Sequence, residues 1–329
     1  MKRGDRTGVA ALALAALVTG TTTGGSLAAF RSATVSASNT FSAAADLVAP
    51  RIVSVVIGKT EGGLTGAIRA GGSYHVYAQV GDPSPSSGIA WVRADVSAIT
   101  PGASAVALVA GSYQAGGLSY NYRSAALSAS AALGAGTSAF SVSSADVAGN
   151  QASATGAVNV DNFPPAAQDV QTTNGGTPGA PDQGDTVTFT FSEPIDPVTV
   201  LPGWNGAATN VVVKISDGLL GNGLLDNDAL TVLGPGGVGS VNLGSVNLGR
   251  PDYVTLTTTF GLAGSASRMA LSGSSVTITL GTPSGLGGLG LALGAGTMIW
   301  SPSSAVTDAA GNPCATSAAT ESGGADKDF

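Results

Sequence analysis

The chain has 329 residues and a formal net charge of −7, with 10% charged residues, 49 glycines and a mean hydropathy of +0.30. Its acidic balance argues against nucleic-acid binding, which needs a basic patch, and against electrostatic docking to anionic lipid. One histidine (His75), one cysteine (Cys314) and three glutamates leave few groups for catalysis, and the absence of a run of about 18 apolar residues predicts no transmembrane helix.

The first 29 residues have the pattern of an export signal. Lys2, Arg3 and Arg6 precede the apolar run Val9–Val18, and small residues at Ser26–Ala29 offer a cleavage site. We therefore expect residues 1–29 to be a signal peptide and the rest of the chain to be secreted, extracellular or associated with the cell surface. The alternative is an uncleaved N-terminal anchor.

Residues 30–49 are expected to form an N-terminal extended segment. The sequences Leu27-Ala-Ala-Phe30, Asn39-Thr-Phe41 and Asp46-Leu47 resemble the N-terminal region of the camelysin/TasA family. That resemblance implies a shared export route, and some members of that family assemble into extracellular matrix fibres. Because Thr, Val and Phe favour strands, Phe30–Leu47 is also a candidate donor strand for self-association.

Residues 50–163 carry short apolar runs separated by turn signals, a pattern that predicts a β-sandwich. In the run Tyr74–Val80, apolar residues alternate with polar ones, which places His75 on a polar face, and Trp91 is a candidate core anchor. The expected strands are Arg51–Gly58, Tyr74–Val80, Ile89–Ile99, Ser119–Arg123, Ala139–Val142 and Ala152–Val160.

Pro164 and Pro165 mark a boundary, because proline interrupts strand pairing and stiffens a linker. Residues 164–316 again predict a sandwich, and residues 317–329 a tail. The duplicated sequence Gly-Ser-Val-Asn-Leu-Gly at 239–244 and 244–249 is interpreted as a loop insertion. The expected strands are Thr186–Phe191, Asn210–Ile215, Ala229–Leu233, Tyr253–Phe260, Ser275–Leu280 and Thr297–Trp300.

The turn sequence D-x-A-G-N occurs at Asp146–Asn150 and again at Asp308–Asn312. Asp and Asn can bond their own backbone, and Gly supplies a positive φ angle. These turns, the junction Asp161-Asn-Phe-Pro-Pro165 and the motif Gly184–Asp196 resemble bacterial immunoglobulin-like domains, the last those of S-layer type. The resemblance implies an all-β protein with two tandem immunoglobulin-like sandwiches.

Oxygen ligands suited to calcium cluster in one glycine-containing loop, at Asp217, Asn222, Asp226 and Asp228. The spacing does not match an EF-hand, and Asx turns in a solvated loop are the alternative. The two D-x-A-G-N turns and Asp161-Asn162 are further candidate donors near the domain junction. No other cofactor is expected, since the G-x-G-x-x-G sequence at residues 285–290 lacks the helix that a dinucleotide fold requires. Cys314 is expected to be inert or partly buried, and a covalent dimer is the alternative.

These features predict a non-catalytic structural or adhesion protein of a bacterial cell surface or matrix. Its expected partners are surface or matrix components, or other copies of the chain. The alternative is a module that binds a polysaccharide or protein ligand, with Tyr113, Tyr120, Tyr122 and Trp204 as candidate contact residues. An enzyme is the least favoured class, because glutamate and histidine are so scarce.

Overall fold

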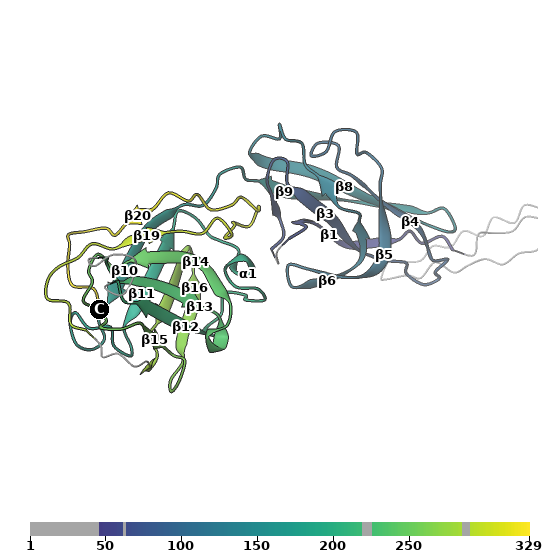
Figure 1. Ribbon diagram of the computed structural model, residues 1–329. Helices are drawn as coiled ribbons and strands as arrows, with labels where there is room; N and C mark the ends of the chain where they lie inside the picture. The colour runs from purple at the N-terminus through teal and green to yellow at the C-terminus, as the bar shows by residue number, and fades with distance from the viewer. Residues whose placement is uncertain (1–45, 62–63, 219–225, 285–289) are drawn as a thin grey trace, which may run out of the picture. The chain divides into compact units, whose positions relative to one another are not determined.

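The computed structural model describes residues 46–61, 64–218, 226–284 and 290–329, and Asp46–Phe329 forms one compact unit. The predicted signal peptide, nearly all of the candidate donor strand, Asn222 and residues 285–289 lie outside the described chain. Regular structure in the described chain is almost entirely β (Figure 1), with one four-residue α-helix, α1 at Pro197–Val200. None of its helices is long and apolar enough to cross a membrane. The prediction of an all-β fold is confirmed.

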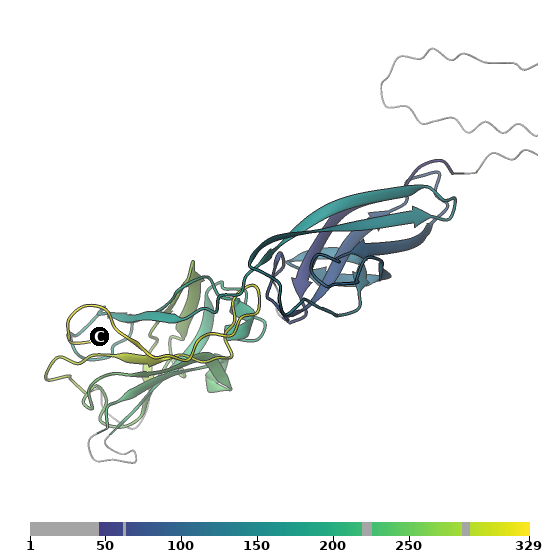
Figure 2. The ribbon, with the colours of Figure 1, turned by 90° about the horizontal axis from the view of Figure 1, so that it is seen from above.

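The first sheet has the strand order β1-β3-β6-β5-β4-β8-β9-β2, with β7 paired to β3. All its pairs are antiparallel except β2 with β9. The long β8–β9 hairpin can be followed in two views (Figures 1 and 2). The strands are β1 Arg51–Lys59, β2 Ala67–Ile68, β3 Ser73–Gly81, β4 Ile89–Asp95, β5 Val106–Ala115, β6 Leu118–Ser124, β7 Leu127–Ser128, β8 Gly136–Asp146 and β9 Gln151–Val160.

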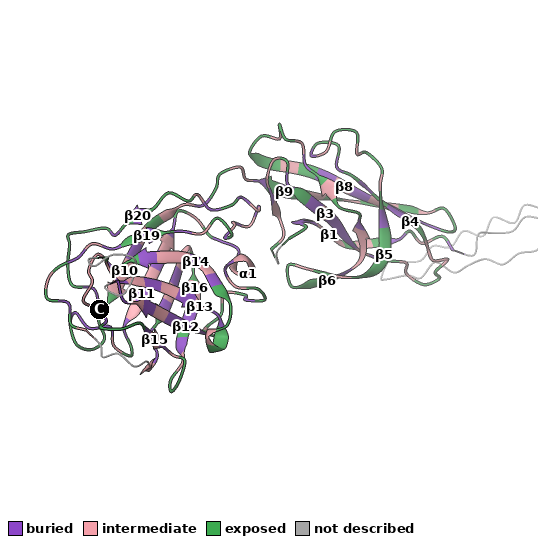
Figure 3. Ribbon diagram, viewed as in Figure 1, coloured by how far each residue is buried: buried purple, intermediate pink, exposed green. Residues whose placement is uncertain are grey.

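Apolar alternation explains why the first sheet buries one face. In β3, Tyr74, Val76, Ala78 and Val80 are all buried, as predicted. Figure 3 colours the strands of this sheet by burial, with buried purple stretches beside exposed green ones. The expectation for Trp91 is wrong, because its neighbours Val92 and Ala94 face the core. The Trp91 ring is only half-buried and instead lies beneath the Arg93 guanidinium, 4.9 Å from the ring centroid. The face of β4 that packs in the core therefore carries small side chains, and the Trp91 ring lies outside the core.

The second sheet has the order β10-β11-β17-β16-β12-β13-β14-β19-β20, with β15 and β18 attached to it through β12. Its described pairs are antiparallel. The strands are β10 Ala167–Thr173, β11 Thr186–Phe191, β12 Thr209–Ser216, β13 Ala229–Leu233, β14 Ser240–Asn247, β15 Thr258–Phe260, β16 Ser267–Ser272, β17 Ser275–Thr279, β18 Pro283–Ser284, β19 Ile299–Ser301 and β20 Ala319–Thr320.

Trp300 is the centre of the second core. It is fully buried, and its ring meets those of Phe189 and Phe191 edge to face, at centroid distances of 5.2 and 4.9 Å. Its indole N–H donates to the carbonyl of Leu243 at 2.6 Å, so the one polar atom of the ring is satisfied. The predicted alternation of β11 is confirmed, with Val187, Phe189 and Phe191 buried between half-buried threonines.

The duplicated Gly-Ser-Val-Asn-Leu-Gly sequence is not a loop insertion. It forms β14, in which Val241 and Leu243 of the first copy are buried. Val246 and Leu248, the corresponding residues of the second copy, are buried as well. A five-residue repeat would ordinarily turn the second copy to the opposite face, since side chains alternate with a period of two. Gly244, at a φ of +83°, absorbs the extra residue where the pairing with β13 shifts register.

The segment Ala319–Phe329 packs along the second sheet. The Phe329 ring is buried against Tyr253, with centroids 5.6 Å apart. Asp328 accepts hydrogen bonds from Thr172 and from the Tyr253 hydroxyl. Glu321 is also buried, and one of its carboxylate oxygens has no hydrogen-bond partner within the described chain. Burial, reinforced by the charges of Asp328, Asp326 and Asp169, raises the pKa of Glu321 to about 7.

This raised pKa predicts a pH-dependent stability. The folded chain holds the Glu321 proton more tightly than the unfolded chain, in which the pKa is near 4.5. The contribution of Glu321 to the free energy of unfolding should therefore fall as the pH rises from about 4.5 to about 7. The Glu321→Gln variant should lose less stability than the wild type between pH 5 and pH 8, measured by thermal unfolding.

The matched control is Glu61→Gln, at an exposed glutamate that follows β1. It should follow the wild-type curve. If the stability of Glu321→Gln also follows the wild-type curve between pH 5 and pH 8, the raised pKa of Glu321 is refuted.

Candidate functional site

The two D-x-A-G-N turns have the same geometry. The carboxylate of Asp146 accepts from the backbone and side-chain amides of Asn150, both at 2.8 Å. The carboxylate of Asp308 accepts the same two bonds from Asn312 at 2.8 Å, and a third from the Gly311 amide at 2.7 Å. In both turns the glycine has a φ above +90°. The repeated sequence therefore encodes a repeated structure.

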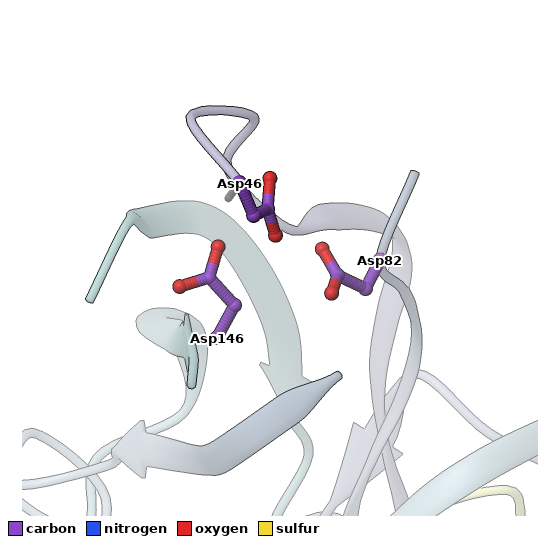
Figure 4. Close-up of side chains that lie close together, drawn as sticks. All are labelled: Asp46, Asp82 and Asp146. Carbon is purple, nitrogen blue, oxygen red and sulfur yellow. The ribbon is translucent and has the colours of Figure 1, made fainter. Parts of the chain in front are cut away.

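Each turn presents its aspartate to two other carboxylates. Asp46, Asp82 and Asp146 form the first acidic group, and each offers one oxygen within 4.8 Å of the others (Figure 4). These residues precede β1, follow β3 and end β8, so the topology gathers them at one end of the first sheet. Asp46 and Asp146 are each only 2% exposed.

The hydrogen bonds of this group leave one oxygen free. Asp46 accepts from the amides of Val48 and Ser87, and the Val48 bond chiefly lowers its pKa. One oxygen of Asp82 accepts from Ser86 and Gly88, while its other oxygen is buried without a partner in the described chain.

The second acidic group consists of Asp161, Glu193 and Asp308, again with one oxygen each within 4.8 Å of the others. Asp161 follows β9 of the first sheet, whereas Glu193 and Asp308 belong to the second half of the chain. Burial raises the pKa of Glu193, and the charges of Asp161 and Asp308 raise it further. The Asn312 side chain donates to the Asp161 carbonyl at 2.9 Å and so joins the second turn to the end of the first sheet.

Both groups suit a hard divalent cation. Calcium prefers carboxylate and carbonyl oxygens at about 2.3–2.6 Å, so two oxygens that bind the same ion lie at most about 4.6–5.2 Å from each other. Three carboxylates within 4.8 Å of one another meet that requirement. The residues of these groups are therefore the ones that could hold a metal.

The predicted calcium loop has a different geometry. The Asp228 carboxylate accepts from the amides of Gly218 and Val254, and its burial raises its pKa. Asp217 is buried and Asp226 exposed, and the three aspartates form no such acidic group within the described chain. Asn222 lies outside the described residues, so the calcium loop stays a prediction.

The remaining candidate residues have mainly structural surroundings. Tyr120 and Trp204 are buried, and the Trp204 indole donates to the Ala207 carbonyl, whereas Tyr113 and Tyr122 are half-buried. His75 Nδ1 lies 3.0 Å from the Ser124 carbonyl oxygen. Cys314 is buried, as expected, and burial raises the pKa of its thiol.

Sequence reasoning named Asp146, Asp161 and Asp308 as oxygen donors but missed Asp46, Asp82 and Glu193. Asp82 directly follows the last residue of β3, and Asp161 directly follows that of β9. An aspartate at a strand end is a signal that could have indicated these groups. Which strand ends meet depends on the sheet order, and a strand pattern along the chain does not contain that order.

No known family model matches the chain, and no curated protein matches it. Among solved structures, the chain is similar to dimeric latent PorU from Porphyromonas gingivalis, at 14% sequence identity and a TM-score of 0.20. The match covers 72% of this chain and 20% of the PorU chain, so this chain spans a fifth of that protein's length. A TM-score of this size supports no inference about fold or function.

The first acidic group predicts a stabilising effect of calcium. A cation that binds only the folded protein raises its melting temperature as the cation concentration rises. Millimolar calcium should therefore raise the Tm of the chelator-treated protein, measured by scanning fluorimetry. Asp82→Asn should reduce that increase, because it removes one ligand charge.

Asp95→Asn is the matched control, because Asp95 is an exposed aspartate whose carboxylate bonds only Ser97 in the described chain. An equal calcium-dependent rise in Asp82→Asn and in wild type would exclude the first acidic group as the binding site.

Proposed function

We propose that the chain is a non-catalytic structural or adhesion protein, exported to the cell surface or extracellular matrix. In this proposal each sheet forms an immunoglobulin-like sandwich, as the D-x-A-G-N turns suggest. The observation that carries the proposal is a buried ion pair that joins the first sheet to the second half of the chain. A buried ion pair of this kind resists separation of neighbouring modules, which suits a protein that transmits force or sets a spacing.

Lys59, the last residue of β1, forms this ion pair with Asp196, and the pair is called the brace below. Its ammonium lies 2.7 Å from a carboxylate oxygen of Asp196, and the two side chains are 7% and 1% exposed. The same ammonium donates to the Asp308 carbonyl at 2.7 Å and to the Thr307 hydroxyl at 3.3 Å. One lysine of the first sheet is thus held by three oxygen groups around α1 and the second D-x-A-G-N turn.

The surroundings of the chemically active side chains support a non-catalytic role. In the described chain His75 Nδ1 bonds the Ser124 carbonyl, and the buried Cys314 thiol bonds the Ala315 carbonyl, so neither side chain is hydrogen-bonded to a nucleophile or base that would activate it. The acidic groups bond mainly to backbone amides, which is an arrangement that fixes loops. Export and surface location rest on the pattern of residues 1–29.

The first test of this function is sedimentation velocity of residues 30–329 over a wide concentration range. A matrix subunit should form large assemblies whose size increases with concentration. Deleting Phe30–Leu47 should then abolish assembly if that segment donates a strand. A monomer at every concentration would refute self-assembly and favour the alternative, a module that binds a separate ligand.

The brace itself predicts a large loss of stability in Lys59→Met. Removing the ammonium leaves the buried Asp196 carboxylate without its counter-charge, which costs about 3–5 kcal/mol of unfolding free energy. The double variant Lys59→Met/Asp196→Leu should recover most of that loss, because it removes both buried charges. Thermal and denaturant unfolding measure both effects.

Arg51→Met is the control for a general loss of positive charge, because Arg51 is an exposed residue at the start of the same strand. A loss in Lys59→Met no larger than in Arg51→Met would contradict the brace.

A further inference from the structure

A pocket of about 320 Å³ opens in the first sheet where β1 and β3 meet the β5–β6 hairpin. This volume falls at the lower end of the range for small-ligand sites, about 300–1,000 Å³. Hydrogen-bonding side chains and glycine backbone make up most of its wall. The lining residues that matter here are Thr60, Thr65, Tyr77, Gln114, Gly116 and Arg123.

Arg123 is the free cation of this pocket. The side chain is half-buried, and no hydrogen bond or ion pair engages its guanidinium within the part of the chain that the structure describes. Lys59 also lines the pocket, but its ammonium is committed to Asp196 and Asp308. The pocket therefore has one guanidinium available for a ligand.

Tyr113 holds that guanidinium in position. Its ring lies 4.4 Å from the Arg123 guanidinium carbon, a cation–π contact. Gly111 makes the arrangement possible, because a Cβ there would lie 2.7 Å from atoms of the Tyr113 ring. The register of β5 against β6 also shifts between Ala110 and Tyr113. Because the contact restricts Arg123 before any ligand arrives, less side-chain freedom is lost on binding.

The rest of the wall suits a ligand rich in hydroxyl groups. Tyr77 contributes aromatic surface and packs on Tyr120, with ring centroids 5.6 Å apart. Thr60, Thr65 and Gln114 contribute donors and acceptors. Gly116 has a φ of +57°, and a Cβ there would lie 2.5 Å from the Thr65 hydroxyl oxygen, so glycine keeps this side of the pocket free.

We propose that this pocket binds a carboxylate-bearing sugar of an acidic saccharide, with Arg123 as the residue that binds the carboxylate. A guanidinium presents two parallel N–H donors that match a carboxylate. One free guanidinium balances one carboxylate, whereas a phosphate dianion would need a second cation. The sugar hydroxyls then bond to the threonines and Gln114. This inference rests on the alternative function, ligand binding, and is independent of self-assembly.

The test compares matched sugars with and without a carboxylate on the full chain. Cellobiouronic acid, digalacturonic acid and sialyllactose are titrated against cellobiose, galactobiose and the methyl ester of sialyllactose by calorimetry, with glucose 6-phosphate alongside. At least one acidic sugar should bind about tenfold or more tightly than its neutral partner, as expected for one charged hydrogen-bonded pair. The binding should weaken as salt is added.

Variants assign the binding to the pocket. Arg123→Gln should abolish the preference for the acidic sugar, and Tyr113→Ala should weaken binding while keeping the preference. Arg93→Gln is the matched control, because Arg93 is also stacked on an aromatic ring but does not line the pocket. It should bind as the wild type does, and circular dichroism confirms that each variant is folded.

Three results would overturn the proposal: no acidic sugar binds better than its neutral partner, glucose 6-phosphate binds best, or Arg123→Gln retains the preference. None of these results bears on sedimentation, so failure of the pocket and failure of the structural role are distinguishable.

Discussion

Hydrogen bonds from backbone amides to buried aspartates are the constraint on which this structure depends. The Asp146 and Asp308 carboxylates close the two D-x-A-G-N turns, and Asp228 holds the backbone of Gly218 and Val254. Each bond satisfies a backbone amide that lies outside the named strands, and a buried amide without a partner is costly. A chain with so few charged residues thus uses several of its aspartates as fixed points for loops.

Three basic side chains of the first sheet make two kinds of contact. Lys59 is fully engaged in a buried ion pair, whereas Arg93 and Arg123 lie over aromatic rings. A buried ion pair fixes geometry because the loss of either partner leaves an uncompensated charge buried, which is strongly unfavourable. A cation–π contact leaves the guanidinium edge free to bond elsewhere. The lysine therefore suits a permanent junction, and a stacked arginine suits reversible recognition.

Periodicity predicted β3 and β11, because each strand has one apolar face and burial of that face stabilises it, but it missed β14, where the short repeat suggested a loop. It failed for Trp91, where residue size suggested a core anchor but alternation favours Val92 and Ala94. The D-x-A-G-N turns could be predicted because their bonds are local. Asp46, Asp82 and Glu193 could not, because their grouping depends on which strand ends meet. Lys59 and Asp308 are 249 positions apart in the sequence, and the local pattern of residues around either one does not indicate that they meet.

The duplicated segment in β14 has an evolutionary consequence. Each five-residue copy carries its own buried valine and leucine, and a glycine with positive φ between the copies restores the facing that an odd-numbered repeat would reverse. One copy alone cannot supply both the Leu243 carbonyl that accepts from the Trp300 indole and the Val246 that pairs with Trp300 in β19. A change in the number of copies would therefore require a compensating change in the core around Trp300.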